Sequence, residues 1–340
     1  MVLILFNQMK RQGNLFEMIV EPENIRIAFL KAVKGKSGKR NVQNFREHLD
    51  EKVFKIRKEL IEGNYLFGNY HFFTIYDPKK RLICAAPFEE RVVFHMIMNV
   101  CHANFECYQI YDSYASRVGK GVYKALERAQ TFCQKYRWFL KIDVKKYFDS
   151  ISHEILKRLL RKRFKDIKLL NLFDRIIDSY NCEDGKGIPI GNFTSQYFAN
   201  HYLAVADHYA KEVLMIKAYV RYMDDIVIFG KDKRVLLKIG HLFKIFCKDK
   251  LQLNFKIFTL NASRYGLPFL GYVVYGNCLR LTLRSKRRFA SKALKCDRAY
   301  QKYLWTEEEC KNRMNALLTF VKKANSYGFR NSVLYRDIFK

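Results

Sequence analysis

The sequence predicts an α+β protein, and three patterns carry this prediction. Two β-prone runs, 219–222 and 226–229, are separated by only three residues, a spacing typical of a tight antiparallel hairpin. A third β-prone run covers 138–144. Apolar residues recur at helical spacing over 45–62, and the basic tail after Thr282 is also expected to be helical. The 340 residues, 49% of them hydrophobic, can bury a core and support two or three subdomains.

The first long helix is expected over 45–62. Asn44 and Glu47 suit an N-terminal cap, and Gly63 suits the end of the helix. The apolar side chains that share one face of this amphipathic helix are Phe45, Leu49, Val53, Ile56 and Leu60.

The next helix is expected to begin after Pro87 and to continue through Val100. Glu89 and Glu90 lie in its first turn, where the partial positive charge of a helix N-terminus favours acids. A basic loop at 77–81 precedes this helix and leads into a short strand.

Further along the chain, basic and apolar residues predict a helix over 155–172, a turn at 184–187 and a helix over about 194–211. In the basic tail, Thr306 and Glu309 have the spacing of a capping box, which predicts that another helix begins there.

Three carboxylates are the strongest chemical signal. Asp224 and Asp225 lie at the tip of the expected hairpin, and Asp143 lies near the end of the strand at 138–144. Neighbouring carboxylates repel one another unless a cation neutralises them, and Mg²⁺ prefers such hard oxygen ligands. We therefore expect two Mg²⁺ ions, with Mn²⁺ as a substitute, serving phosphoryl transfer. On these residues alone, an ordinary Asp-rich turn is the alternative.

Composition narrows the class of partner. The 63 Lys and Arg residues exceed the 33 Asp and Glu residues, so the net charge is +30, and this charge is spread along the chain. Such a distribution favours nucleic acid over a membrane surface, which is usually bound by short polybasic segments. The nine cysteines include no C-x-x-C pair, and no apolar run has membrane-spanning length. We expect a cytoplasmic protein with reduced thiols and no membrane partner.

The order of these motifs resembles that of reverse transcriptases across nearly the whole chain. Tyr222-Met223-Asp224-Asp225 stands between two strands, and Asp143 is followed five residues later by Phe148. A Gly/Ser/Gln element lies between these motifs. The resemblance implies a right-hand polymerase fold with fingers, an antiparallel-sheet palm and a helical thumb. The implied boundaries are 1–86 and 150–186 for the fingers, 87–149 and 187–281 for the palm, and 282–340 for the thumb.

The resemblance also implies roles at the reacting groups. Asp143, Asp224 and the carbonyl of Val144 would hold the metal ions, and Asp225 would support them. Lys256 matches a lysine proposed to protonate the pyrophosphate leaving group.

Nucleotide contacts are implied for three further segments. Phe148 would exclude a 2′-hydroxyl, and Lys146 and Tyr147 would offer backbone N–H groups to the triphosphate. A core aromatic is the structural alternative for Phe148, and a solvated loop is the alternative for the basic run. The remaining positions implied to contact the nucleotide are Lys79, Lys80 and Arg81 in the basic loop and Ile190, Gly191 and Gln196 in the Gly/Ser/Gln element.

The primer and template are implied to lie against Tyr222 and against Phe269, Leu270 and Gly271, which resemble a hairpin that grips the primer end. The basic residues after Ser285 would contact phosphates of the duplex without reading sequence.

The element Gly187 to Gln196 indicates the branch of the family. Intron-encoded and retron enzymes usually have Gln before the second Gly and Ser-Pro at the end, whereas this chain has Ile190 and Ser195-Gln196. This pattern resembles the reverse transcriptases of diversity-generating retroelements, which copy a template RNA with errors at adenines. The implied partners are template RNA, an RNA–cDNA duplex, dNTPs and a small basic accessory protein.

Two alternatives stay open. The enzyme could instead resemble a group II intron, retron or phage-defence reverse transcriptase, although Ser195-Gln196 argues against these. From a different class, a non-catalytic RNA-binding protein could keep the same fold, but all three carboxylates and Phe148 are present.

Overall fold

The computed structural model describes residues 13–76 and 80–335, and the chain divides into two compact units. The first unit contains the described residues up to Tyr111 together with Val144–Met215 and Phe243–Lys256. The second unit contains Asp112–Asp143, Ile216–Leu242 and the described residues from Ile257 onward. The expected division into fingers, palm and thumb stays a prediction.

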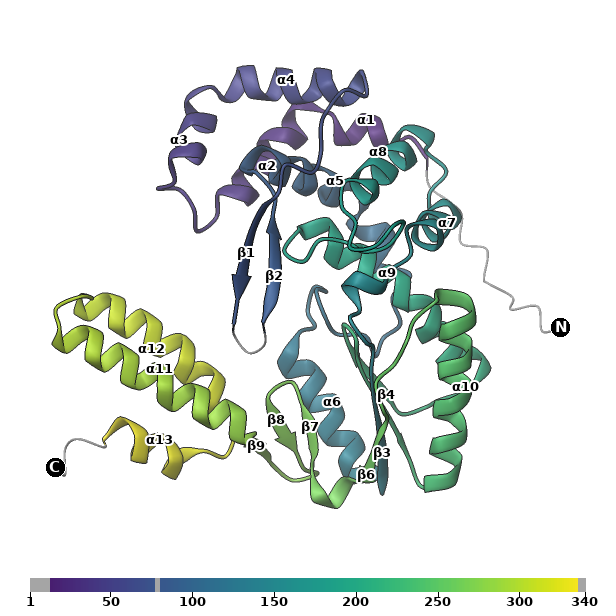
Figure 1. Cartoon of the computed structure of the whole chain (residues 1–340), viewed down its shortest axis with the longest axis vertical. Helices are drawn as coiled ribbons and strands as arrows, with labels where there is room; N and C mark the ends of the chain where they lie inside the picture. Colours follow the sequence, from purple (N-terminus) through teal and green to yellow (C-terminus); the bar gives the residue numbers. More distant parts are fainter. Residues whose placement is uncertain (1–12, 77–79, 336–340) are drawn as a thin grey trace. The chain divides into compact units, whose positions relative to one another are not determined.

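The first unit is mainly helical and carries one two-stranded antiparallel sheet, β1-β2 (Figure 1). Its elements are α1 (Leu15–Ile19), α2 (Pro22–Val33), α3 (Arg40–Glu47), α4 (Leu49–Ile61), β1 (His71–Ile75), β2 (Arg81–Ala85), α5 (Phe88–Glu106), η1 (Phe148–Ser150), α7 (His153–Arg163), α8 (Ile167–Asp178), α9 (Phe193–His208) and η2 (Tyr209–Val213). The helix α10 (Lys233–Leu251) runs across a boundary between the units.

The second unit contains a four-stranded sheet of order β4-β5-β3-β6 and a three-stranded sheet of order β7-β8-β9. All strand pairs in both sheets are antiparallel. Its elements are α6 (Val122–Lys135), β3 (Trp138–Asp143), β4 (Tyr219–Tyr222), β5 (Asp225–Gly230), β6 (Thr259–Ala262), η3 (Ser263–Tyr265), β7 (Leu267–Phe269), β8 (Tyr272–Val274), β9 (Leu279–Leu281), α11 (Leu283–Gln301), α12 (Glu307–Lys322) and α13 (Tyr327–Leu334). The α+β class is therefore confirmed.

The expected helix over 45–62 is two helices. The chain breaks at His48, so Phe45 belongs to α3 and Leu49 begins α4. The expected cap at Asn44 and Glu47 is wrong, because both residues lie inside α3 and the N-cap of α4 is His48. The apolar face survives the break, since Phe45 and three apolar residues of α4 are buried. Gly63 follows the helix end in a left-handed conformation, as expected.

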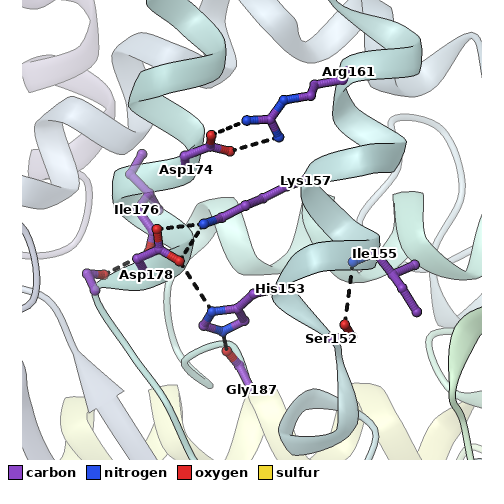
Figure 2. Close-up of polar contacts among 10 residues, drawn as sticks. Ser152, His153, Ile155, Lys157, Arg161, Asp174, Ile176, Asp178 and Gly187 are labelled. Atoms are coloured by element: carbon purple, nitrogen blue, oxygen red, sulfur yellow. Dashed lines mark hydrogen bonds and ion pairs between the residues drawn. The ribbon is translucent and has the colours of Figure 1, made fainter. Parts of the chain in front are cut away.

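The expected helix over 155–172 is also split, into α7 and α8. Each has its own N-cap: the Ser152 hydroxyl accepts a hydrogen bond from the Ile155 N–H, and the Asp166 carboxylate accepts one from the Leu169 N–H. Polar side chains join the two helices in Figure 2, where Arg161 pairs with Asp174. Short polar caps decide these breaks more strongly than apolar periodicity does.

The helix after Pro87, the helix from Phe193 and the hairpin 219–230 are present as expected, and the turn expected at 184–187 lies at 184–185, closed by a bridge between Glu183 and Lys186. Thr306 and Glu309 form the expected capping box of α12.

The core of the second unit lies between its two sheets and α6. Because side chains alternate along a strand, one face of the four-stranded sheet presents Phe139, Val220 and Val227, all buried. These residues pack in one cluster with the inner face of α6 and with apolar residues of β7, β8 and β9. The helices α11 and α12 lie side by side in Figure 1, and Phe289 and Val321 join the same cluster.

All nine cysteines are free of disulfide bonds, as the missing C-x-x-C pair suggested. Within residues 13–76 and 80–335, no helix is long and apolar enough to cross a membrane.

Candidate functional site

The three candidate carboxylates lie at one end of the four-stranded sheet. Asp143, the last residue of β3, is paired directly with Asp225, the first residue of β5. Tyr222, the last residue of β4, is paired with Asp225 from the other side. Directly opposed residues of antiparallel strands project to the same face. Tyr222, Asp225 and Asp143 therefore form a row across three strands, and Asp224 lies in the two-residue turn beside it.

The row lies at the partly exposed edge of a buried sheet. Ile226, Val227 and Ile228 behind it are fully buried, whereas the carboxylates are half-buried. Burial raises the pKa of the Tyr222 hydroxyl above its ordinary value. Buried apolar strands thus carry polar side chains at a partly exposed edge of the sheet.

Lys141 lies next to the row on the same face, two residues before Asp143. Its ammonium forms an ion pair with the Asp225 carboxylate at 3.1 Å and donates a hydrogen bond to the Pro268 carbonyl at 3.3 Å. One positive charge is therefore already part of the carboxylate cluster.

The side chain of Arg221 contacts the turn of the hairpin 219–230. This side chain is fully buried, and its guanidinium donates a hydrogen bond to the Met223 carbonyl at 3.1 Å. Met223 has a φ of 51°, in the left-handed region that a non-glycine residue rarely adopts. The backbone of Arg221 is held in turn by the segment 112–114: the Arg221 N–H donates to the Asp112 carbonyl, and the Tyr114 N–H donates to the Arg221 carbonyl. We infer that Arg221 stabilises the turn that carries Asp224.

The donors of this site suit Mg²⁺ better than they suit a metal ion that is enclosed by protein ligands alone. These donors are carboxylate oxygens, the ligands that Mg²⁺ prefers, and Mg²⁺ is usually bound through one or two carboxylates together with substrate phosphates. In the part of the chain that the structure describes, no group of three or more His, Cys, Asp or Glu side chains is gathered closely enough to hold a metal by itself.

In the first unit, the expected nucleotide residues come together through backbone hydrogen bonds. The Ile188 N–H donates to the Phe148 carbonyl at 3.0 Å, which holds the start of the 187–196 element beside Phe148. The Cys84 N–H of β2 donates to the Ile190 carbonyl at 2.8 Å. Phe148, Ile190 and the strand that follows the basic loop are therefore neighbours.

Gly191 lies close to β2. Its φ is +120°, and a Cβ there would lie 3.0 Å from the Ile83 side chain and 3.2 Å from the Cys84 carbonyl. A glycine is required at this position by conformation and by space. Gln196 is half-buried in the first turn of α9.

Gly187, at the start of the element, is anchored by the buried His153. One ring nitrogen of His153 lies 2.7 Å from the Gly187 carbonyl, and the other lies 3.5 Å from the Asp178 carboxylate (Figure 2). Lys157 pairs with the same carboxylate at 2.6 Å. The start of the 187–196 element is therefore held by side chains of α7 and α8.

The remaining residues expected to contact the nucleotide are Lys146, Tyr147 and those of the basic loop. Tyr147 is buried and its hydroxyl donates to the Ala199 carbonyl, whereas Lys146 is exposed with a φ of 48°. Arg81 and Lys80 are exposed at the start of β2, and Lys79 lies outside the described residues.

Val144 forms an isolated antiparallel bridge with Phe255, and the exposed Lys256 directly follows that bridge. Val144 and Lys256 are therefore near neighbours in the first unit, although the side chain of Val144 is buried and only its carbonyl suits the role expected from the resemblance.

The expected primer hairpin is formed by β7 and β8, with Leu270 and Gly271 as its turn. Both have positive φ, 49° and 88°. The Gly271 carbonyl accepts hydrogen bonds from Thr282 and from the Ser285 hydroxyl, at 3.2 and 2.7 Å, which ties the turn to the start of α11. Phe269 is only 1% exposed, so its ring belongs to the core.

Sequence reasoning did not single out Lys141, Arg221 or His153. Two of these residues could have been noticed in the sequence, because Lys141 and Arg221 are charged residues inside strands that are otherwise apolar or aromatic. The contact of His153 with Gly187 joins residues 34 positions apart and had no local signal.

Comparison with known proteins agrees with the resemblance of the sequence to reverse transcriptases. A family profile described as reverse transcriptase (RNA-dependent DNA polymerase) matches residues 77–274, more than half of the chain. Protein YkfC of Escherichia coli (strain K12) is 21% identical over 280 residues, covering 69% of this chain and 72% of YkfC. The group II intron-encoded protein LtrA of Lactococcus lactis is 23% identical over 213 residues, covering 59% of this chain and 36% of LtrA.

Other relatives and a solved structure extend the comparison. A putative COX1/OXI3 intron 1 protein of Saccharomyces cerevisiae is 21% identical over 221 residues, covering 61% of this chain but 26% of that protein. The structure of apo telomerase from Candida tropicalis has a TM-score of 0.50 and 13% identity, covering 86% of this chain and 64% of the telomerase chain. The chain thus spans under two thirds of the telomerase and a smaller part of the intron proteins.

The telomerase likeness supports the expected polymerase fold and nothing finer. The family profile covers Asp143, the 187–196 element and the Asp224-Asp225 turn together. This chain belongs to the reverse transcriptase (RNA-dependent DNA polymerase) family.

Proposed function

We propose that this protein is an RNA-directed DNA polymerase that copies a template RNA into cDNA. The observation that carries the proposal is the direct pairing of Asp143 with Asp225 beside the turn that holds Asp224. Asp143, Asp224 and the Val144 carbonyl would hold two Mg²⁺ ions, with Asp225 in support and Mn²⁺ as a substitute. When bound, the ions would activate the primer 3′-hydroxyl and stabilise the leaving pyrophosphate.

The residues of the chain itself would position the substrates. Phe148, held by its carbonyl to the 187–196 element, would present its half-buried ring to the sugar and exclude a 2′-hydroxyl. Arg81 and Lys80 would neutralise the triphosphate charge. The exposed Lys256 would deliver a proton to the leaving group. The turn at Leu270 and Gly271 would hold the primer end, and basic residues of α11 would contact phosphates of the duplex.

Primer extension on an RNA template tests the polymerase proposal. We expect Asp224→Asn to lower extension by at least about 100-fold, because the neutral amide is a poor Mg²⁺ ligand. Asp249→Asn removes an exposed acid of α10 and serves as the matched control, with activity near wild type. A wild-type chain without activity on any RNA template, yet with tight RNA binding, would favour a non-catalytic RNA-binding protein instead.

The finer proposal is that the enzyme belongs to a diversity-generating retroelement. The features that support it are Ile190 and Ser195-Gln196, and the implied partners are a template RNA and a small basic accessory protein. An intron-type enzyme is the second candidate, because LtrA and the yeast protein are described as intron proteins.

Sequencing of cDNA copied from a defined RNA separates these two candidates. Errors concentrated at template adenines, and a rise in activity when a small basic protein encoded nearby is added, are expected for the retroelement enzyme. Errors spread evenly over the four bases would favour the intron-type enzyme.

A further inference from the structure

Lys141 carries a further inference about how the carboxylate row is organised. In the register of the sheet, Lys141 is paired with Val227, two positions from the Asp143–Asp225 pair on the same face. Side chains in such diagonal positions are within reach of each other when one of them is long. Accordingly, the Lys141 ammonium lies 3.1 Å from the Asp225 carboxylate.

The contact is more than an exposed surface ion pair. The side chains of Lys141 and Asp225 are 22% and 30% exposed, so both are largely withdrawn from water. The ammonium has a second acceptor, the Pro268 carbonyl of β7 at 3.3 Å, which restricts its position from a different strand. Two acceptors on separate elements make Lys141 a link between the carboxylate row and the hairpin that begins at β7.

The charge of Lys141 distinguishes the three carboxylates from one another. An ammonium near Asp225 offsets one of three neighbouring negative charges, which lowers their mutual repulsion before any cation binds. It also occupies one oxygen of the Asp225 carboxylate, which disfavours Asp225 as a direct ligand of a divalent ion.

We propose that Lys141 is a positioning residue that holds Asp225 in a supporting role and ties it to the β7–β8 hairpin. The proposal rests on the polymerase function proposed above. The proposed role of Lys141 requires no contact with the reacting atoms or with the metal ions. Lys141 acts through Asp225 and Pro268, so that the carboxylates and the primer end keep one fixed spacing.

Removal of the ammonium has two separable consequences. Without its positive charge, the row attracts divalent cations more strongly, so Lys141→Met should bind Mn²⁺ about three- to tenfold more tightly. Without its link, Asp225 and the hairpin lose their fixed spacing, so kcat of primer extension should fall about tenfold while the KM for dNTP stays nearly constant. Tighter ion binding combined with slower chemistry is an outcome that a merely structural lysine would not produce.

The experiment compares four proteins with the wild type: Lys141→Met, Lys141→Arg, Asp225→Asn and the double variant Lys141→Met/Asp225→Asn. Mn²⁺ binding is measured by titration calorimetry without nucleic acid, and thermal unfolding is measured without metal. Lys141→Arg keeps the charge and should recover most of kcat. In the Asp225→Asn background, Lys141→Met should change thermal stability far less than it does in the wild type.

Lys135→Met is the control, because Lys135 is an exposed lysine of the same unit and the substitution changes the net charge equally. Mn²⁺ affinity of Lys141→Met within twofold of the wild type overturns the proposal, as does an additive double-variant cycle. A wild type that lacks polymerase activity overturns the proposed function instead, because the binding and unfolding measurements need no turnover.

Discussion

The hairpin 219–230 and the element 187–196 reach their positions by different means. The hairpin is held mostly by its neighbours in sequence, since β4 and β5 are joined by a two-residue turn and Arg221 supports the turn from two residues away. Among the described residues, none of the named strands includes or pairs with the 187–196 element. The element depends on hydrogen bonds with the Cys84 N–H, the Phe148 carbonyl and the His153 ring, which lie 34 or more positions away.

This difference explains why the position of the hairpin can be predicted from local sequence pattern, whereas the position of the 187–196 element cannot. Alternating apolar residues around a short turn specify the register of a hairpin, and the register alone brings Asp225 opposite Asp143 once β3 joins the sheet. A loop that is positioned by distant groups shows only its glycines in the sequence, because Cys84 and Phe148 contribute backbone groups and His153 lies 34 positions from Gly187.

The largest expected effect concerns Arg221, the support of the hairpin. Arg221→Met removes a buried hydrogen bond to the Met223 carbonyl, so the free energy of unfolding should fall by about 3–4 kcal/mol. Arg284→Met, at an exposed position of α11, is the control. Urea denaturation measures both. A loss below about 1 kcal/mol would mean that the strand register holds the turn without help from Arg221.

A smaller effect is expected from Glu90 in the first unit, which also carries the 187–196 element. Glu90 is 2% exposed, and no described residue donates a hydrogen bond to its Oε1. Burial raises its pKa to about 7, although a backbone hydrogen bond with Gly68 opposes the shift. The folded state therefore holds a proton that the unfolded state releases between pH 4.5 and about 7.

Because the folded-state pKa of this acid is raised, its contribution makes the protein less stable as the pH rises through that window. We expect Glu90→Gln to be more stable than the wild type by about 2–3 kcal/mol at pH 8 and to differ little at pH 4. Hydrogen exchange resolved by peptide should locate the change in the first unit. Glu89→Gln, where Glu89 is half-exposed and paired with Lys52, should leave the pH profile unchanged. Equal shifts in both variants would argue against the burial of Glu90 as the cause.

The smallest effect is expected at Ile190, within the distantly supported element. Its side chain is half-buried and offers only apolar contact, so in the proposed nucleotide site it could form no hydrogen bond that checks the incoming nucleotide. Ile190→Gln should restore about 1 kcal/mol of discrimination, which corresponds to about five- to tenfold fewer errors opposite template adenines. Sequencing of cDNA measures the error rate, and Ile167→Gln, at an exposed position of α8, is the control. Unchanged errors would discard the role of Ile190 in fidelity.

Local pattern determined most of the secondary structure but placed some boundaries wrongly. The helices predicted over 45–62 and 155–172 both have the expected apolar faces, yet each is broken in two. Periodicity averages over many residues, whereas a break depends on one residue such as His48 or Asp166 adopting a non-helical conformation. The capping box at Thr306 was predictable because both of its partners lie within four residues.

The sequence by itself determined the α+β class, the hairpin that carries Asp224 and Asp225, and the strand that ends in Asp143. These follow from residue types at short spacing, where strand alternation and turn length leave few alternatives. Only the tertiary structure decided that Lys141 pairs with Asp225 and reaches Pro268, that Arg221 lies under the turn, and that His153 anchors Gly187. Such contacts depend on which strands become neighbours and on where backbone carbonyls point. The residue types of the hydrogen-bond acceptors determine neither of these.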